Sequence, residues 1–337
     1  MSHMRTIVLA VLVGSPLAAQ GAPSTDVWVV PIREGGATLT VGEPRNLTHR
    51  RGYDNQPSFT PAGDAVLYTV VGDDGQADIW RVNVRGGVPV RVTRTAESEY
   101  SPTVTPDGRY VSVIRVERDS TQRLWKFPVA GAGDPELVLR DVKPVGYHVW
   151  ASEHQLALYV LGGALGTPAA DANTLQLADD RTGRVAIVAH AIGRALVKVP
   201  GRDAITFVQF ERDSARWISE LDVRTGATRR LMAPPRGAEY HAWTPGGLLV
   251  TAAGSKLYLW SDGAWGVAAD LGRWGVRGIS RIAVSPKGDW LAFVAEDRAA
   301  PSALRSPAPG RTFSDRRRSG TRCTAPPIPS RSFTTSP

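Results

Sequence analysis

Short apolar runs with alternating polar positions recur along most of the chain at an interval of about 45 residues. In the clearest copy, residues 101–114, an alternating run is followed by the turn Pro106-Asp107-Gly108 and then by a run rich in β-branched residues. Related copies occupy residues 56–68 and 281–293. Proline presets φ for such a turn and glycine supplies a positive φ. Each copy therefore predicts a strand, a tight turn and a second strand.

Each repeat is predicted to supply four strands, of which the first carries the turn. Second strands, rich in β-branched and aromatic residues, are expected at residues 65–71, 109–116, 155–161, 204–210, 248–253 and 290–295. Third strands are expected at residues 78–82, 122–127, 174–177, 217–221 and 256–260. Shorter and more polar fourth strands, typical of outer edges, are expected at residues 89–92, 135–139, 184–189, 228–231 and 265–269.

The sixth repeat, residues 280–296, lacks its third and fourth strands. The missing pair is found at the other end of the pattern, because residues 26–32 match 78–82 and residues 44–48 match the outer strands. A repeat of this length is the size of a propeller blade. We therefore predict an all-β fold, a six-bladed β-propeller of four-stranded blades whose last blade is closed by the N-terminal strands.

The two ends of the chain differ in character from the repeats. Arg5, the apolar run 7–13 and the small residues before position 20 predict a signal peptide at residues 1–19, and hence a periplasmic or secreted protein. The propeller is expected over residues 26–297. Residues 298–337, rich in Arg, Pro and Ser, are expected to be a disordered tail or the product of a shifted or truncated reading frame.

The formal net charge of +8 arises largely in that tail, where eight arginines follow Asp297 and Asp315 is the single acidic residue. The repeats themselves are close to neutral and offer no basic stripe, so no nucleic-acid partner is expected. The one cysteine, Cys323, also lies in the tail, which excludes an intramolecular disulfide. No integral membrane segment is expected after cleavage of the signal peptide.

The repeat units 53–63 and 99–108, each followed by an apolar strand and a unit such as Asp78-Ile79-Trp80, resemble the TolB-like, WD40-like (PD40) propeller repeats. The resemblance covers roughly residues 26–297. It implies a secreted or periplasmic six-bladed propeller that mainly binds proteins or peptides. The chain lacks a recognisable α/β domain ahead of the propeller, unlike TolB, which argues against a role in the Tol system.

Residues just before each inner strand are expected to converge at one mouth of the central channel, because radial symmetry brings equivalent positions together. The predicted ligand-binding set combines carboxylates, tyrosines, histidines and arginines: Asp54, Asn55, Glu97, Glu99, Tyr100, Tyr147, His148, Arg194, Tyr240, His241 and Arg281. They favour a mouth that binds a ligand or peptide. The alternative is that they bond to neighbouring blades and fill a wet channel.

A metal site and a hydrolytic site have weaker support. Asp54, Asn55 and Glu99 could offer oxygen ligands to Ca²⁺, but regular acidic spacing is missing. His148 and His241, beside Trp150 and Trp243, make a poor zinc site by themselves. The chain contains no Gly-x-Ser-x-Gly elbow, His-Glu-x-x-His pair, phosphate loop or dinucleotide fingerprint. We expect no cofactor and no catalytic residue.

Three functions are compatible with these patterns. The leading hypothesis is an exported, non-enzymatic and monomeric TolB-like propeller that binds a protein, peptide or small ligand at its channel mouth. The second is the propeller portion of an exported hydrolase of peptidase or amidohydrolase type that is truncated after residue 297. The third is a metal-dependent, lactonase-like enzyme.

Overall fold

The structure is a computed structural model that describes residues 24–131, 133–162, 172–211 and 215–297. The expected signal peptide and the expected tail lie outside the described residues. The described part belongs to a single compact unit. Within these ranges, no helix has the length and apolar character needed to cross a membrane.

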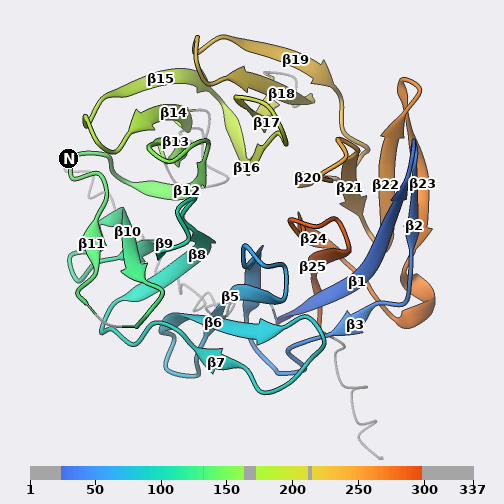
Figure 1. The fold of residues 1–337 in the computed structure, drawn as a ribbon, viewed down its shortest axis with the longest axis horizontal. Coiled ribbons are helices and arrows are strands. Elements are labelled where there is room, and N and C mark those ends of the chain that lie inside the picture. The colour runs from blue at the N-terminus through green and yellow to red at the C-terminus, as the bar shows by residue number, and fades with distance from the viewer. Residues whose placement is uncertain (1–23, 132, 163–171, 212–214, 298–337) are drawn as a thin grey trace, which may run out of the picture. The chain divides into compact units, whose positions relative to one another are not determined.

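Antiparallel sheets stand around a common centre as the blades of a propeller (Figure 1). The first three blades consist of β4 (Asp54–Phe59), β5 (Ala65–Val71), β6 (Ala77–Asn83) and β7 (Val90–Arg91); β8 (Ser98–Val104), β9 (Tyr110–Val116), β10 (Gln122–Pro128) and β11 (Glu136–Leu137); and β12 (Val145–Trp150), β13 (Gln155–Val160), β14 (Thr174–Asp179) and β15 (Val185–His190). The next two consist of β16 (Ile192–Lys198), β17 (Ala204–Phe210), β18 (Arg216–Asp222) and β19 (Thr228–Met232); and β20 (His241–Trp243), β21 (Leu249–Ala253), β22 (Lys256–Ser261) and β23 (Ala264–Asp270).

The sixth blade joins the two ends of the repeat region, as the sequence predicts. Its strands are β24 (Ser280–Val284), β25 (Trp290–Glu296), β1 (Thr25–Gly35), β3 (Arg45–Asn46) and β2 (Thr38–Val41); a short 3-10 helix, η2 (Gly272–Trp274), precedes it. Strand β1 runs antiparallel to β25, from Thr25 opposite Glu296 to Pro31 opposite Trp290. The predicted six-bladed, all-β fold with an N-terminal closing strand is therefore confirmed.

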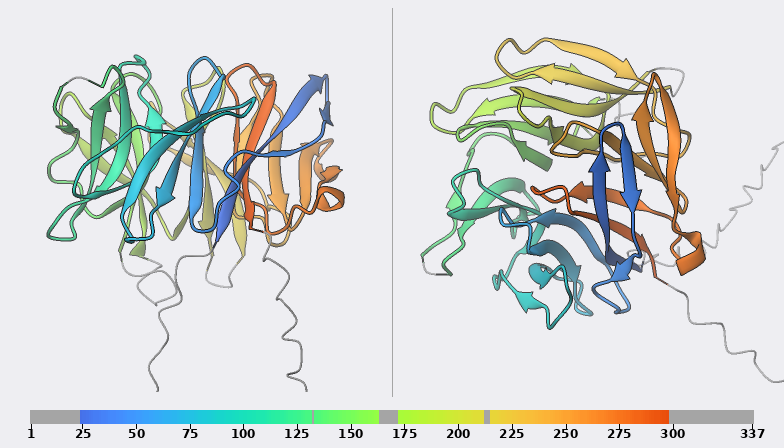
Figure 2. Two further views of the ribbon diagram at one scale, coloured as in Figure 1. Left: turned by 90° about the horizontal axis from the view of Figure 1, so that it is seen from below. Right: turned by 45° about the vertical axis from the view of Figure 1, so that its right-hand side comes forward.

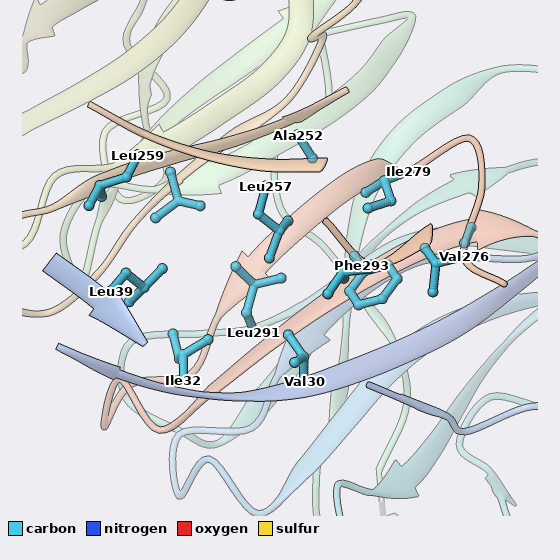
Figure 3. Packing of buried hydrophobic residues seen from close by; sticks show 13 residues of the cluster. Val30, Ile32, Leu39, Ala252, Leu257, Leu259, Val276, Ile279, Leu291 and Phe293 are labelled. Carbon is cyan, nitrogen blue, oxygen red and sulfur yellow. The ribbon is translucent and has the colours of Figure 1, made fainter. Parts of the chain in front are cut away.

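Strand β2 was not expected from the repeat. It forms a hairpin with the second half of β1, in which Ile32 lies opposite Val41 and Gly35 opposite Thr38. Ile32 and Leu39 pack into one buried cluster with Leu257 and Leu259 of the fifth blade (Figure 3). Figure 2 shows this hairpin at the edge of the ring, beside β22 and β23. The hairpin thus fastens the closing blade to its neighbour as well as to β25.

The same apolar position is buried in every blade. The second or third residue of each third strand is fully excluded from solvent; these residues are Val27, Ile79, Leu124, Leu175, Ile218 and Leu257. Each faces an equivalent residue of the second strand, for example Ile79 opposite Thr69 and Val27 opposite Val294. The repeat in the sequence is therefore a repeat in the packing between blades.

We predict that Val27→Ala lowers the free energy of unfolding by about 2 kcal/mol, because it opens a cavity between the closing blade and the first blade. Urea unfolding followed by tryptophan fluorescence measures the change. The control is Val267→Ala on the outer strand β23, where the side chain is 56% exposed, and it should change stability little. Equal losses in the two variants would contradict the assigned role of β1.

Candidate functional site

A cavity of about 140 Å³ lies among the inner strands, where the blades converge. We call it the channel cavity. Every blade contributes to its wall; the contributing residues used below are Gln56, Ser101, Tyr147, Arg194, Tyr240 and Arg281. One polar or aromatic side chain thus comes from each of the six blades.

These side chains are placed by a repeated backbone feature. In every blade, the residue that opens the inner turn donates its backbone N–H across the turn, as Thr60 does to Ala65 and Ser285 does to Trp290. Gln56 and Arg281 each lie four positions before that residue. Strand pairing slips at this point in five of the blades, which creates a β-bulge. Bulges re-aim side chains and are common beside functional sites.

The bulge requires an unusual backbone in three blades. Gln56, Ser101 and Arg281 have φ values of 59°, 54° and 40°. Side-chain-bearing residues rarely adopt this left-handed region, and such strain persists where the surrounding structure imposes it. The fourth blade differs, because Ala195 stands at the equivalent position and Arg194 enters from a longer irregularity between Ile192 and Leu196.

Tyr147 is positioned by close packing within its blade. Its ring meets the Tyr159 ring edge-on, with the centroids 5.6 Å apart. A Cβ at Gly146 would lie 2.9 Å from the Tyr159 ring, so only glycine fits beside it without a shift. The Gly-Tyr pair in the sequence therefore reflects the fit of these two aromatic rings.

Arg281 lies between two tyrosines from other blades. Its guanidinium carbon is 4.9 Å from the ring centroid of Tyr147 and 4.8 Å from that of Tyr240. Its Nη2 donates a hydrogen bond of 2.7 Å to the Tyr147 hydroxyl. Burial opposes ionisation of Tyr147, but Arg281 and Arg194 outweigh it and lower the pKa of that phenol. Burial raises the pKa of Tyr240. The cavity is thus an electropositive, aromatic site.

The two predicted histidines line the cavity in matching arrangements. The Ser112 hydroxyl of the second blade bonds to Nε2 of His148 at 2.7 Å and accepts a hydrogen bond of 2.9 Å from Nε1 of Trp150. It donates to the Thr103 carbonyl at 2.9 Å. Burial lowers the pKa of His148 to about 3. This ring is therefore neutral at physiological pH.

The fourth and fifth blades repeat the arrangement. The Thr206 hydroxyl bonds to Nε2 of His241 at 2.8 Å and accepts from Nε1 of Trp243 at 2.9 Å. Burial lowers the pKa of His241 to about 4. The His-x-Trp spacing thus places both side chains of each pair on one hydroxyl of the preceding blade.

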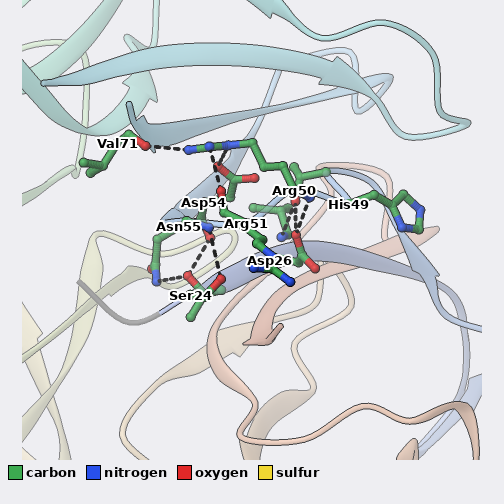
Figure 4. A network of polar contacts seen from close by, with 12 residues as sticks. Ser24, Asp26, His49, Arg50, Arg51, Asp54, Asn55 and Val71 are labelled. Atoms are coloured by element: carbon green, nitrogen blue, oxygen red, sulfur yellow. Dashed lines mark hydrogen bonds and ion pairs between the residues drawn. The ribbon is translucent and has the colours of Figure 1, made fainter. Parts of the chain in front are cut away.

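The predicted carboxylate Asp54 is not part of the cavity wall. It is buried, and Nε of Arg50 donates to its Oδ1 at 2.8 Å while Nη2 of the same arginine reaches the Val71 carbonyl (Figure 4). Burial outweighs Arg50 and raises the pKa of Asp54 to about 6. Neighbouring Asn55 donates to the Thr25 hydroxyl at 3.3 Å. The backbone carbonyl of Asp54 accepts from the same Thr25 hydroxyl, so both residues link the first blade to the closing strand.

Glu97 and Glu99 also lie away from the cavity wall. Both pair with Arg115 of the adjacent strand β9, and Glu99 accepts a short hydrogen bond from the Thr95 hydroxyl. Burial raises the pKa of Glu99 to about 7. Tyr100 packs against the apolar cluster of the second and third blades. The structure thus brings six of the predicted residues to the cavity: Tyr147, His148, Arg194, Tyr240, His241 and Arg281.

Gln56 and Ser101 line the cavity but were missed by sequence reasoning. Their fixed position, four residues before the turn, is the signal that could have identified them. Among the described residues, no group of three or more His, Cys, Asp or Glu side chains is placed to hold a metal ion.

The contribution of Glu99 to stability should fall as pH rises, because the folded state retains the proton of Glu99 that the unfolded chain releases near pH 4.5. Between pH 5 and 8 the free energy of unfolding of the wild type, measured relative to that of Glu99→Gln, should drop by about 1–3 kcal/mol, because the opposing contributions of His148 and His241 are the same in both proteins. Chemical unfolding across this range tests it. Glu136→Gln, at a carboxyl paired with Lys126 and half exposed, should keep the wild-type slope. Parallel profiles for Glu99→Gln and wild type would contradict the assignment.

No family model matches the chain. An uncharacterized protein of Agrobacterium fabrum (strain C58) is 31% identical over 78 residues, which are 23% of this chain and 26% of that protein. The chain thus spans about a quarter of the length of the curated relative that it matches.

Three solved structures share the fold. A putative TolB from Agrobacterium tumefaciens has a TM-score of 0.63 at 16% identity, covering 83% of this chain and 100% of that one. A gluconolactonase from Xanthomonas campestris has a TM-score of 0.57 at 12% identity, covering 83% and 99%. TolB from Acinetobacter baumannii has a TM-score of 0.51 at 12% identity, covering 81% and 64%. At these identities the likeness shows the fold alone, which is that of a six-bladed β-propeller.

Proposed function

We propose that this chain is a non-enzymatic propeller that binds a protein, peptide or small ligand at its channel mouth. The observation that carries the proposal is the channel cavity, to which each of the six blades contributes a polar or aromatic side chain. Tyrosine and arginine are the residue types that dominate binding energy at protein interfaces. Convergent groups of this kind in a concave site are typical of ligand recognition.

The two histidines support binding over catalysis. Each ring nitrogen Nε2 is engaged by a hydroxyl, and burial keeps both rings neutral. A general base works best when its pKa lies near the operating pH. His148 and His241 are therefore poorly suited to proton transfer, and their contacts to the neighbouring blades suit a structural role.

The rest of the proposal extends the family resemblance. We assign the repeats to the TolB-like, PD40 type and the mature chain to a monomer in the periplasm or outside the cell. The signal peptide at residues 1–19, the propeller at 26–297 and the tail at 298–337 belong to the same proposal. A protein or peptide partner fits the fold likeness to TolB.

A lactonase-like activity is the second candidate, because the Xanthomonas gluconolactonase shares the fold. It would appear as hydrolysis of a lactone that depends on an added divalent cation. Asp54 and Glu99, the acidic residues considered as ligands, are committed to Arg50 and Arg115 instead. The binding function is therefore the one that the site favours.

The test is affinity capture from a cell-envelope extract by wild type and by the double variant Tyr147→Ala, Tyr240→Ala. We expect the double variant to lose bound partners by about thirtyfold, as removal of central aromatic anchors costs about 2 kcal/mol or more. The control is Tyr110→Ala, whose ring stacks with Lys126 in the second blade, outside the cavity. Near-UV circular dichroism establishes that each variant is folded. Equal capture by wild type and the double variant would refute a binding role for the cavity.

A further inference from the structure

Two cationic side chains face the channel cavity without an anionic partner. Arg194 of β16 and Arg281 of β24 both line it, and the lining contains no Asp or Glu among the described residues. Neither arginine forms an ion pair within the part of the chain that the structure describes. The hydrogen bond from Arg281 goes to a phenol, which leaves its positive charge unbalanced.

Other partly buried arginines are matched with carboxylates. Arg50 pairs with Asp54 at 2.8 Å, Arg91 with Asp78 at 2.7 Å and Arg123 with Glu117 at 2.8 Å. Removing a charge from water without a partner is costly. Among the described residues, the partly buried arginines outside the channel are therefore balanced by carboxylates, and the two in the channel are not.

Further groups at the cavity are hydrogen-bond donors. The Gln56 carbonyl Oε1 already accepts from the Thr69 hydroxyl and the Ser101 backbone N–H, each at 2.8 Å. The side-chain amide of Gln56 also hydrogen-bonds the Tyr147 phenol, so this side chain adds donor groups to the cavity wall. The buried Ser101 hydroxyl has no hydrogen-bond partner in the structure. An unsatisfied hydroxyl donor beside two cations without a carboxylate partner is the complement of an oxyanion.

We propose that the channel mouth binds its ligand through an oxyanion, a carboxylate or phosphate group held by Arg194 and Arg281. The inference rests on the proposed function, since it names the ligand chemistry of the same site. Guanidinium matches both groups with two parallel hydrogen bonds. The stacking of Arg281 between Tyr147 and Tyr240 orders it before binding, which lowers the entropic cost. A cavity of about 140 Å³ suits the anionic end of a ligand.

The experiment measures the thermal midpoint of the full chain while sodium acetate or inorganic phosphate replaces sodium chloride at constant ionic strength. Binding to the folded state raises the midpoint in a saturable way. We expect this rise in wild type, with the apparent affinity reduced about tenfold or more in Arg281→Gln and in Arg194→Gln. Arg109→Gln is the control, because that arginine is exposed and pairs with Asp107. A stronger response to acetate identifies a carboxylate ligand, and a stronger response to phosphate a phosphorylated one.

The thermal midpoint of Arg194→Gln in chloride also distinguishes an arginine that binds a ligand from one that only stabilises the fold. Since the substitution removes one of two neighbouring like charges, the midpoint in chloride should equal or exceed that of wild type, which a purely structural arginine would not allow. The same response in all four proteins, or none in wild type, would overturn the inference. An absent response together with lost capture by the tyrosine double variant would refute the oxyanion chemistry and leave the binding function standing. A response that only the channel variants lose, with unchanged capture by the double variant, would support the oxyanion site and refute the proposed function.

Discussion

The pairing of β1 with β25 is the constraint on which the remaining structure depends. Strand β25 lies between β1 and β24, and β24 carries Arg281 into the channel. The same N-terminal segment bonds to the first blade, where the Thr25 hydroxyl donates to the Asp54 carbonyl at 3.0 Å. Ring closure therefore sets both the stability of two blade interfaces and the position of one wall of the site. Strand β1 pairs with β25 on one side and with β2 and β3 on the other, so the closing strand itself is not left as a long open sheet edge.

The six blades share one backbone arrangement, and the channel cavity arises because the side chain four residues before the inner turn is not the same in each blade. All blades share the turn hydrogen bond and the buried third-strand residue, so the backbone delivers an equivalent position to the channel from each. The side chain at that position differs from blade to blade, and Tyr147, Tyr240 and Arg281 occupy it in three of them. In the fourth blade Ala195 stands there, and the neighbouring Arg194 reaches the cavity instead. Within each repeat, the residues that maintain the fold and the residue that faces the cavity are thus only a few positions apart.

Much of the fold could be predicted because the alternation of apolar and polar residues repeats in each blade. The predicted third strand 78–82, for example, lies within β6 (Ala77–Asn83). Strand β2 could not be predicted, because the apolar surface of the fifth blade against which it packs forms only when the chain has folded. Sequence reasoning grouped Asp54 and Glu99 with the channel because they precede the inner strands. They instead lie within β4 and β8, opposite Val70 and Arg115, ahead of the bulge that turns Gln56 and Ser101 inward.

The central claim is that Arg194 and Arg281 form one anion-binding site in the channel. Its most direct test is two-dimensional NMR of the arginine Nε–Hε groups, assigned with the two glutamine variants and followed during titration with acetate and with inorganic phosphate. The account predicts that the signals of Arg194 and Arg281 shift together and saturably with at least one of these anions, while that of exposed Arg109 does not. Unmoved channel signals with both anions, or shifts no larger than that of Arg109, would contradict it.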